Sequence, residues 1–145
     1  MIRYISGNIF DCPAQTIVNP VNTVGVMGAG LAKKFKEHYP NTFAKYKTVC
    51  DKKLFDIGKL MLTHEQYHMV ILFPTKRHFS NSSQLDYIEA GLQKFVSVYK
   101  EKGIQSIAFP KLGCGLGGLN WKQQVKPIME KYLSPLPITI YIYGA

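Results

Sequence analysis

The chain has 145 residues, a length that suits a single domain spanning 1–145 and able to bury about two thirds of its unfolded surface. Its 46% apolar, 12% aromatic and 19% charged residues are typical of a globular protein and exclude a disordered chain. The net charge of +9 favours an anionic partner such as a nucleotide or a nucleic acid, although a lysine-rich surface also forms for solvation alone.

The sequence also lacks the signals of membrane and disulfide-bonded proteins. No apolar run approaches the roughly 20 residues of a membrane-spanning helix, and the first ten residues lack the apolar segment of a signal peptide. Three widely spaced cysteines, Cys12, Cys50 and Cys114, fit reduced thiols better than a disulfide framework or a metal cluster. We therefore expect a cytoplasmic monomer with no membrane partner, no metal and no cofactor.

In chain order, the hydrophobic pattern predicts strands that alternate with helices. Short runs of β-branched and aromatic residues predict strands at 2–5, 16–21, 58–63, 67–73, 104–110 and 137–144. Helical spacing predicts helices at 31–39, 42–54, 82–103 and 119–133, and two glycine loops lie at 25–32 and 113–118. Right-handed crossovers between such strands predict an α/β fold, a three-layer α/β/α sandwich with a mixed, largely parallel central sheet.

Capping and helix-breaking residues set the expected ends of the helices. They are Pro40, which stops the first helix, Asn41, which caps the second, Ser82 or Ser83, which begins the third, Gly103, which ends it, and Asn120, which opens the fourth. The third helix is expected to bury Leu85, Ile88, Leu92, Phe95, Val96 and Tyr99.

The stretch HEQYH, from His64 to His68, matches the signature of zinc metalloproteases. That signature requires a helix, which places both histidines on one face, whereas the flanking runs here predict strands and end at Pro74. In a strand, residues four apart lie about 13 Å from each other, too far for both to bind one zinc at about 2 Å. We therefore interpret the stretch as a hairpin connection.

Both glycine loops follow a predicted strand and precede a predicted helix, a position where backbone N–H groups bind phosphate. Neither loop fits G-x-G-x-x-G at the first strand, and neither has the Gly-Lys-Ser/Thr ending of a Walker loop, which argues against Rossmann and P-loop enzymes. Either loop alone would be interpreted as a tight turn.

Five segments together resemble the macrodomain family, whose fold binds ADP-ribose. They are GNIF at 7–10, VNPVNTVGVMGAGLAKKF at 18–35, FPTKRHF at 73–79, FPKLGCGLGGLNW at 109–121 and ITIYIY at 138–143. The lysine in FPTKRHF resembles the branch that contains the terminal ADP-ribose protein glycohydrolases and the DarG-type antitoxin macrodomains. Within this branch the segments look most similar to DarG, which removes ADP-ribose from DNA.

The resemblance implies a role for each matching position. Asn8 and Ile9 match the adenine site, Asn22 matches the residue that orients the distal ribose, and Tyr141 or Tyr143 would flank the adenine from one face of the last strand. The first phosphate loop would be Gly25, Val26, Met27, Gly28, Ala29 and Gly30, followed by Leu31. Gly113, Cys114, Gly115, Leu116 and Gly117 would close over the pyrophosphate and ribose from the other side, and Thr75 would also bind ADP-ribose.

Lys76 is the expected catalytic residue, because the matching lysine of this branch attacks the anomeric carbon of the distal ribose and forms a covalent sugar adduct that water resolves. The attack needs a neutral amine, so the lysine pKa must fall from about 10.4 through desolvation or nearby cations. Arg77 and His78 follow directly in the sequence. Without the resemblance, Lys76 would be interpreted as a surface lysine after a proline turn.

The chain departs from the family pattern at three positions. Asn8 stands where the family usually has Asp, so adenine recognition would rely more on the Ile9 backbone. Glutamate-specific relatives carry an acidic residue where this chain has Gly117, and DarG-like chains often have Asp where this one has Asn120. Neither position supplies a carboxylate, so an acid would come from elsewhere, from the substrate, or not at all.

The resemblance therefore implies an ADP-ribosyl glycohydrolase that removes ADP-ribose from a DNA nucleobase, or from a protein glutamate ester or O-acyl-ADP-ribose. One alternative is a non-catalytic reader module that holds ADP-ribose in the same cleft. Another is a nucleic-acid-binding domain without ADP-ribose affinity. The implied partners are ADP-ribose, ADP-ribosylated DNA or protein, and a DarT-type toxin if the chain is part of a larger antitoxin.

Overall fold

The computed structural model describes residues 1–144 and contains one six-stranded sheet. Its strands are β1 (Ile2–Ile5), β2 (Thr16–Val21), β3 (Met61–His64), β4 (Met69–Pro74), β5 (Ser106–Phe109) and β6 (Thr139–Tyr143). Their spatial order is β1-β6-β5-β2-β4-β3, and every neighbouring pair is parallel except the antiparallel pair β3 and β4. The predicted mixed, largely parallel sheet is confirmed.

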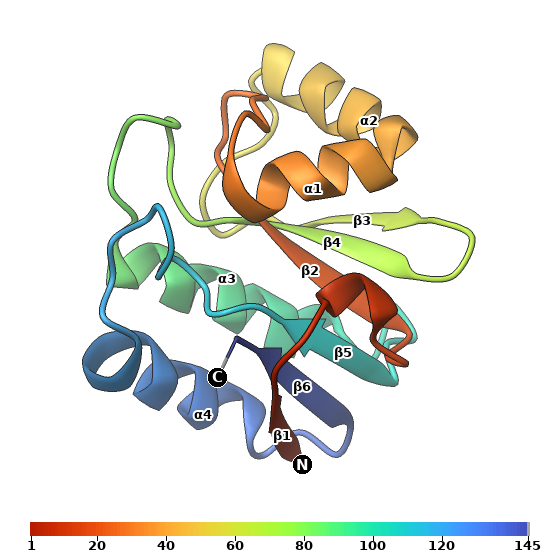
Figure 1. Cartoon of the computed structure of the whole chain (residues 1–145), viewed down its shortest axis with the longest axis vertical. Helices are drawn as coiled ribbons and strands as arrows, with labels where there is room; N and C mark the ends of the chain where they lie inside the picture. The colour runs from red at the N-terminus through yellow and green to blue at the C-terminus, as the bar shows by residue number, and fades with distance from the viewer. Residues whose placement is uncertain (145) are drawn as a thin grey trace.

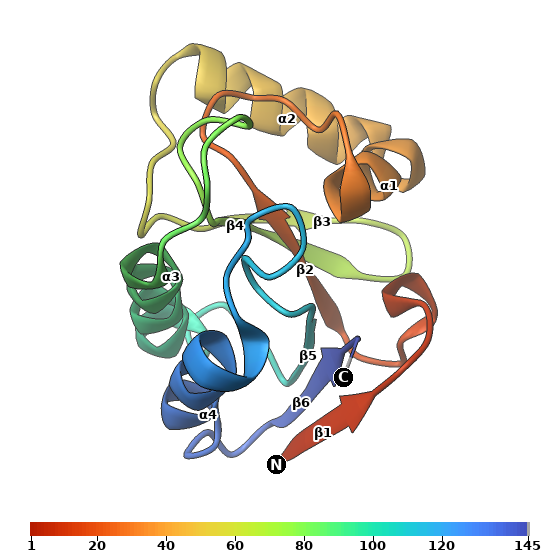
Figure 2. The ribbon, with the colours of Figure 1, turned by 60° about the vertical axis from the view of Figure 1, so that its left-hand side comes forward.

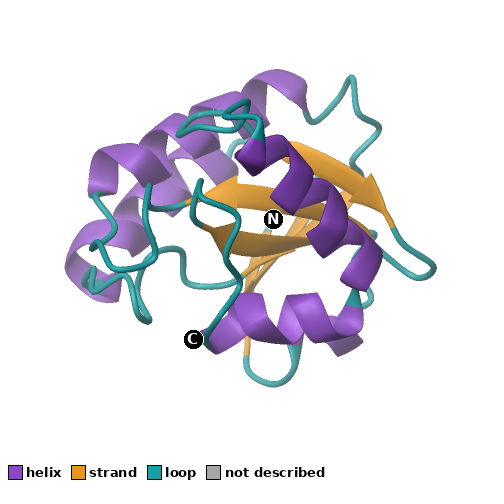
Figure 3. Ribbon diagram, turned by 90° about the horizontal axis from the view of Figure 1, so that it is seen from above, coloured by secondary structure: helices purple, strands orange, loops and turns teal. Residues whose placement is uncertain are grey.

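Helices cover both faces of this sheet (Figures 1 and 3). They are α1 (Gly30–His38) and α2 (Pro40–Asp51) on one face, and α3 (Leu85–Val98) and α4 (Lys126–Leu133) on the other. Alternation along β2 serves both layers, because Ile17 packs under α1 and α2 whereas Val18 packs under α3 and α4. This burial on both faces explains the nearly continuous apolar sequence of the central strands. The three-layer prediction is confirmed.

Two expected helix starts are wrong. Pro40 begins α2 instead of only stopping α1, because its fixed φ and missing N–H suit the first turn of a helix, and Asn41 therefore lies inside the helix. The third helix begins at Leu85 after Gln84, so neither Ser82 nor Ser83 caps it. The face predicted for this helix does pack in the core, and α3 ends at Val98, before the turn that contains Gly103.

The expected opening of the fourth helix at Asn120 is confirmed. The Asn120 side chain accepts a hydrogen bond of 2.8 Å from the N–H of Gln123. A π-helical turn, Trp121–Val125, follows this cap and leads directly into α4. Within residues 1–144, none of the helices has the length and apolar character needed to cross a bilayer.

The HEQYH stretch forms the hairpin between β3 and β4, as predicted. His64 pairs with Met69 across the ladder, and the N–H of Glu65 donates to the His68 carbonyl at 2.8 Å. His68 is buried, with Nε2 2.9 Å from the Cys12 carbonyl and Nδ1 3.2 Å from the Tyr39 hydroxyl. His68 therefore connects the hairpin to the segment after β1 and to the end of α1.

The parallel strands bring the carboxyl ends of β2, β4, β5 and β6 to one edge of the sheet, where both glycine loops and the segment after Pro74 lie (Figure 2). Open α/β sheets bind ligands at such an edge. The fold therefore gathers the predicted site residues from distant parts of the sequence.

Candidate functional site

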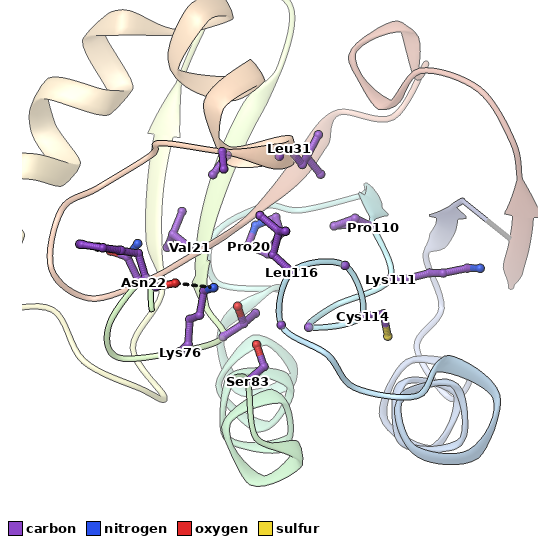
Figure 4. A pocket seen from close by; sticks show the side chains of 18 of the residues that line it. Pro20, Val21, Asn22, Leu31, Lys76, Ser83, Pro110, Lys111, Cys114 and Leu116 are labelled. Carbon is purple, nitrogen blue, oxygen red and sulfur yellow. Dashed lines mark hydrogen bonds between the residues drawn. The ribbon is translucent and has the colours of Figure 1, made fainter. Parts of the chain in front are cut away.

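A cavity of about 860 Å³ lies at this edge, a volume typical of small-molecule sites. The predicted residues that line it are Asn22, Val26, Gly28, Ala29, Gly30, Leu31, Thr75, Lys76, Gly113, Cys114, Gly115, Leu116, Gly117 and Tyr143. Figure 4 shows Leu31 on one side of the cavity and Lys76 and Ser83 on the other. The two glycine loops approach each other over the cavity, since a Cβ added at Gly30 would lie 3.4 Å from Leu116.

The first glycine loop is held in place by the side chain of Asn22. Its Oδ1 accepts hydrogen bonds from the N–H groups of Val24 (3.1 Å) and Val26 (3.3 Å), while its Nδ2 donates to the Val26 carbonyl (2.8 Å). The hydroxyl of the fully buried Tyr46 lies 2.8 Å from both the backbone oxygen and Oδ1 of Asn22. Burial raises the Tyr46 pKa, so this group remains a neutral donor. Asn22 therefore shapes the loop as well as lining the cavity.

Two residues of this loop lie behind the cavity wall. Gly25 has φ +86°, and a Cβ at this position would lie 3.3 Å from the Cβ of Cys50, so the loop packs closely on α2. Met27 is buried, with its sulfur 3.7 Å from Nδ2 of Asn19. Both residues support the loop from the protein side and are absent from the cavity lining.

The second glycine loop packs on the segment before α3. The N–H of Ser83 donates to the Gly117 carbonyl at 3.0 Å. A Cβ added at Gly117 would lie 2.3 Å from Ser83 Oγ and 2.5 Å from the Gly113 carbonyl oxygen. A side chain at position 117 would therefore require the loop backbone and Ser83 to shift.

Lys76 follows β4 and projects into the cavity (Figure 4). Its Nζ donates to the Phe79 carbonyl at 3.1 Å. The next two residues in the sequence, Arg77 and His78, make other contacts. The Arg77 guanidinium lies 3.4 Å from Asp56 Oδ1 and donates to the Tyr87 hydroxyl at 3.0 Å.

The second neighbour, His78, also contacts groups other than the Lys76 amine. Its Nδ1 lies 2.7 Å from Ser80 Oγ, and its ring packs on Phe79 with the centroids 4.1 Å apart. The N–H and the hydroxyl of Thr23 both donate to the Arg77 carbonyl, at 3.2 and 3.0 Å. These bonds tie the lysine segment to the first glycine loop.

The residues predicted to surround adenine are only partly at the cavity. Tyr143 lines it. The pKa of Tyr143 is raised, mainly by burial and to a smaller extent by a hydrogen bond with Cys12. Tyr141 lies on the same face of β6, one step back, outside the lining. Asn8 and Ile9 also lie outside the lining. Asn8 caps the 3-10 helix Ile9–Asp11 by accepting from the Phe10 N–H at 3.0 Å, and Ile9 is buried.

The sequence did not indicate several lining residues. Phe79 and Pro110 belong to the motifs FPTKRHF and FPKLGCGLGGLNW, so their place in these motifs could have indicated that they line the site. Ser83 was interpreted as a helix cap, a local role that hides its position in the cavity. The lining residues missed by sequence reasoning are Pro20, Val21, Ala32, Phe79, Ser83, Pro110, Lys111 and Gly144.

The chain is similar in sequence to known proteins over almost its whole length. The chain is 39% identical over 98% of its length to the DNA ADP-ribosyl transferase-DNA ADP-ribosyl glycohydrolase fusion protein of Thermosipho africanus. It is 35% identical over 99% of its length to the DNA ADP-ribosyl glycohydrolase of Thermus aquaticus. The chain spans 41% of the length of each of these relatives.

Solved structures show the same likeness. The macrodomain of Thermus aquaticus DarG superposes with a TM-score of 0.94 at 35% identity, covering 100% of this chain and 99% of that one. The Thermosipho africanus DarTG in complex with ADP-ribose gives a TM-score of 0.91 at 40% identity, covering 98% of this chain and 41% of that one. The model of the Macro domain family matches residues 18–128. The chain therefore belongs to the Macro domain family and is similar to the DarG macrodomains over its described fold.

Proposed function

We propose that this chain binds ADP-ribose in the cavity and removes it from modified DNA through covalent attack by Lys76. The observation that carries the proposal is the Lys76 amine inside a cavity formed by two glycine loops. The similarity to DNA ADP-ribosyl glycohydrolases over almost the whole chain supports the choice of substrate. The net charge of +9 suits a polyanionic substrate.

The diphosphate would bind between the two glycine loops. The helix α1 begins at Gly30, and its N-cap residue, Ala29, contributes no side-chain hydrogen bond. Backbone N–H groups at this helix start are therefore available to an anion, and the helix dipole favours negative charge there. The glycine-rich segment 113–117 would close over the ligand from the opposite wall, and Tyr143 would contact the adenine.

The chemistry would proceed in two steps. In the first, the nitrogen lone pair of Lys76 attacks the anomeric carbon of the distal ribose. The bond between this carbon and the modified base breaks, and its electrons stay on the base, which remains part of the DNA. In the second, water attacks the same carbon and releases both ADP-ribose and the free lysine. Within residues 1–144, the cavity lining contains no Asp or Glu, so the leaving base would take its proton from water.

Lys76→Ala tests this proposal on two substrates, an ADP-ribosylated oligonucleotide and an ADP-ribosylated protein. The expected result is rapid release from DNA by the wild type and loss of that release in the variant. Lys94→Ala is a matched control, because it removes the same charge from the exposed surface of α3. Equal release by wild type and Lys76→Ala would remove the lysine from the mechanism. Mass spectrometry of a trapped sugar adduct on Lys76 would identify the nucleophile directly.

A second candidate function, a reader that binds ADP-ribose without turnover, is favoured by the absence of a carboxylate from the described lining. Calorimetry together with the release assay distinguishes the two, because a reader binds ADP-ribose tightly and leaves both conjugates intact.

We also propose that the chain opposes a DarT-type DNA ADP-ribosyl transferase, because the Thermosipho africanus relative joins both activities in one protein. We expect co-expression of the wild type to restore growth of cells that carry the transferase, and Lys76→Ala to fail. Growth restored equally by both proteins would contradict antitoxin action through hydrolysis. Sedimentation of the purified chain tests the expected monomer, and cell fractionation tests the expected cytoplasmic location.

A further inference from the structure

Phe79 is a large aromatic side chain that is exposed at the mouth of the cavity. It lines the cavity, and 52% of its surface is accessible to solvent. Val26 and Leu116 also line the cavity and are exposed, at 37% and 71%. Exposed apolar residues that gather at one place mark surfaces where a partner binds. The mouth of the cavity is therefore suited to a group with an apolar face.

The Phe79 ring is held in place by its own segment. The His78 ring packs on it with the centroids 4.1 Å apart and the planes at 33°. His78 is fixed in turn by Ser80, whose hydroxyl lies 2.7 Å from Nδ1 and whose N–H donates to the same atom at 3.2 Å. A ring that is ordered before binding loses little conformational entropy when a ligand packs against it. Phe79 is therefore a preformed platform, with His78 behind it and solvent in front.

Phe79 lies close to the amine that would carry out the reaction. The Lys76 Nζ donates to the Phe79 carbonyl at 3.1 Å. The modified base is bonded to the carbon that Lys76 would attack, so its nearest atom must lie within about 5 Å of the amine, the sum of a reactive approach and one covalent bond. The base of the substrate and Phe79 thus share one end of the cavity.

The other end of the cavity suits the adenine. Figure 4 shows Lys76 and Lys111 at opposite ends. Lys111 packs beside Gly144, where an added Cβ would lie 3.9 Å from its Cδ and Cε, and Gly144 follows Tyr143. Within residues 1–144, the aromatic residues of the lining are Phe79 and Tyr143, and Tyr143 is only 9% exposed. A ligand with its adenine at Tyr143 and its distal ribose at Lys76 would therefore direct the attached base toward Phe79.

We propose that Phe79 stacks on the nucleobase from which ADP-ribose is removed, and that this contact selects DNA over a protein substrate. The inference rests on the proposed function, because it takes Lys76 as the nucleophile. A base has a flat π-face that packs on an aromatic ring, whereas the ester of a modified glutamate presents no ring. Both faces of a base are covered within a duplex, so the modified base must be unpaired or rotated out of the helix to make this contact.

Binding measured in a Lys76→Ala background tests the contact, because this background should leave the modified oligonucleotide intact. We expect Phe79→Ala in this background to lower the affinity for a single-stranded ADP-ribosylated oligonucleotide about five- to a hundredfold, as for the loss of one base stack. The affinity for free ADP-ribose, which carries no base at the anomeric carbon, should stay unchanged. Phe79→Trp should retain the affinity for the oligonucleotide, and Phe79→Leu, which keeps apolar bulk without a ring, should lose it.

Tyr67→Ala is the matched control in the same background. Tyr67 is an exposed aromatic residue of the hairpin between β3 and β4, outside the cavity lining. We expect this variant to keep the affinity for both ligands, so that removal of an exposed ring by itself is shown not to weaken binding. The melting temperature of Phe79→Ala should also stay close to that of its parent, because the ring is half exposed. A purely structural role for Phe79 would lower the melting temperature and the affinity for free ADP-ribose together.

Turnover by proteins that keep Lys76 gives a second measurement. Phe79→Ala should raise KM for the modified oligonucleotide and leave kcat within about twofold of the wild type, as for the loss of a binding contact. The carbonyl that accepts from Lys76 Nζ is a backbone group and remains in the variant. A fall in kcat at unchanged KM would overturn the stack in favour of a role in positioning Lys76.

Each outcome of the binding measurement has a definite meaning. Equal affinity for the modified oligonucleotide with and without the Phe79 ring would overturn the inference, as would full affinity in Phe79→Leu. A wild type that binds the oligonucleotide but does not cleave it would refute the proposed function, while the affinities would still decide the role of Phe79. Cleavage by Lys76→Ala would refute the lysine mechanism, and the KM comparison would then decide the role of Phe79.

Discussion

The hydroxyl of Tyr46 in α2 lies 2.8 Å from the backbone oxygen and 2.8 Å from Oδ1 of Asn22, at the end of β2. This contact joins a fully buried residue to the side chain that organises the first glycine loop. The geometry of the proposed diphosphate site therefore depends on a hydrogen bond made behind it, on the side away from the ligand.

Tyr46→Phe should weaken both stability and ligand binding. Loss of the donor leaves the backbone oxygen of Asn22 without its hydrogen bond and removes one of three from Oδ1, so we expect the free energy of unfolding to fall by about 1–3 kcal/mol. The first glycine loop should also become more mobile, which should lower the affinity for ADP-ribose. Denaturant unfolding and calorimetry measure the two effects. Tyr67→Phe is the control, because Tyr67 is 81% exposed and its loss should change neither quantity. Unaltered ADP-ribose binding in Tyr46→Phe would show that the loop holds its shape without this bond.

Gly117→Ala should destabilise the second glycine loop. The new Cβ would overlap Ser83 Oγ and the Gly113 carbonyl, and relief requires a backbone shift. We expect a loss of about 1–3 kcal/mol in the free energy of unfolding, typical of overpacking, together with weaker ADP-ribose binding. Gly115→Ala in the same loop is the control, since no atom lies within 4 Å of its added Cβ. Similar stability of the two variants would contradict the steric overlap expected at position 117.

The two histidines of the HEQYH stretch should differ in their effects. His68→Ala leaves the buried Cys12 carbonyl without a partner and opens a void, so we expect a loss of about 2–4 kcal/mol. His64 is exposed, and His64→Ala should stay within about 0.5 kcal/mol of the wild type. Thermal unfolding with and without a chelator measures both effects. A zinc site would instead make both variants and the chelator equally damaging.

Stability should decline in alkaline solution partly through Cys50. Burial is the main cause that raises the pKa of its thiol from 9.0 to about 11. The unfolded chain therefore releases this proton first, so the contribution is fully present below about pH 9 and is lost as pH rises toward about 11. Unfolding measured from pH 8 to 11 should show a smaller decline in Cys50→Ala than in the wild type. Parallel curves would exclude a contribution from this thiol.

The strand and helix order was predictable because its signals are local. The run TIVNPV of β2 is buried on both faces, and such a run is nearly continuous in apolar residues at any position in a parallel sheet. The hairpin at His64–His68 followed in the same way from the β-branched residues around it. The family match and the position of Lys76 after a strand depended on short contiguous motifs. The roles of the site residues stay predictions until the variants are measured.

Residues with two competing local roles were predicted less well. Asn41 is a good cap by itself, but the preceding Pro40 already fits the first turn of α2. Ser83 also favours a helix start, yet it lies two residues before α3 and lines the cavity instead. Capping rules consider one residue at a time, so they do not include the effect of Pro40 on Asn41 or the contact of Ser83 with Gly117.

The sequence by itself determined the alternation of elements, the two glycine loops and the lysine between them, because periodicity and backbone freedom are properties of contiguous residues. Only the tertiary structure decided that Ser83 faces Gly117 and that Tyr46 supports Asn22, since these residues are far apart along the chain. Their contacts depend on how the parallel strands and the packed helices bring separate segments to one edge of the sheet, and no local pattern encodes a distance across that edge.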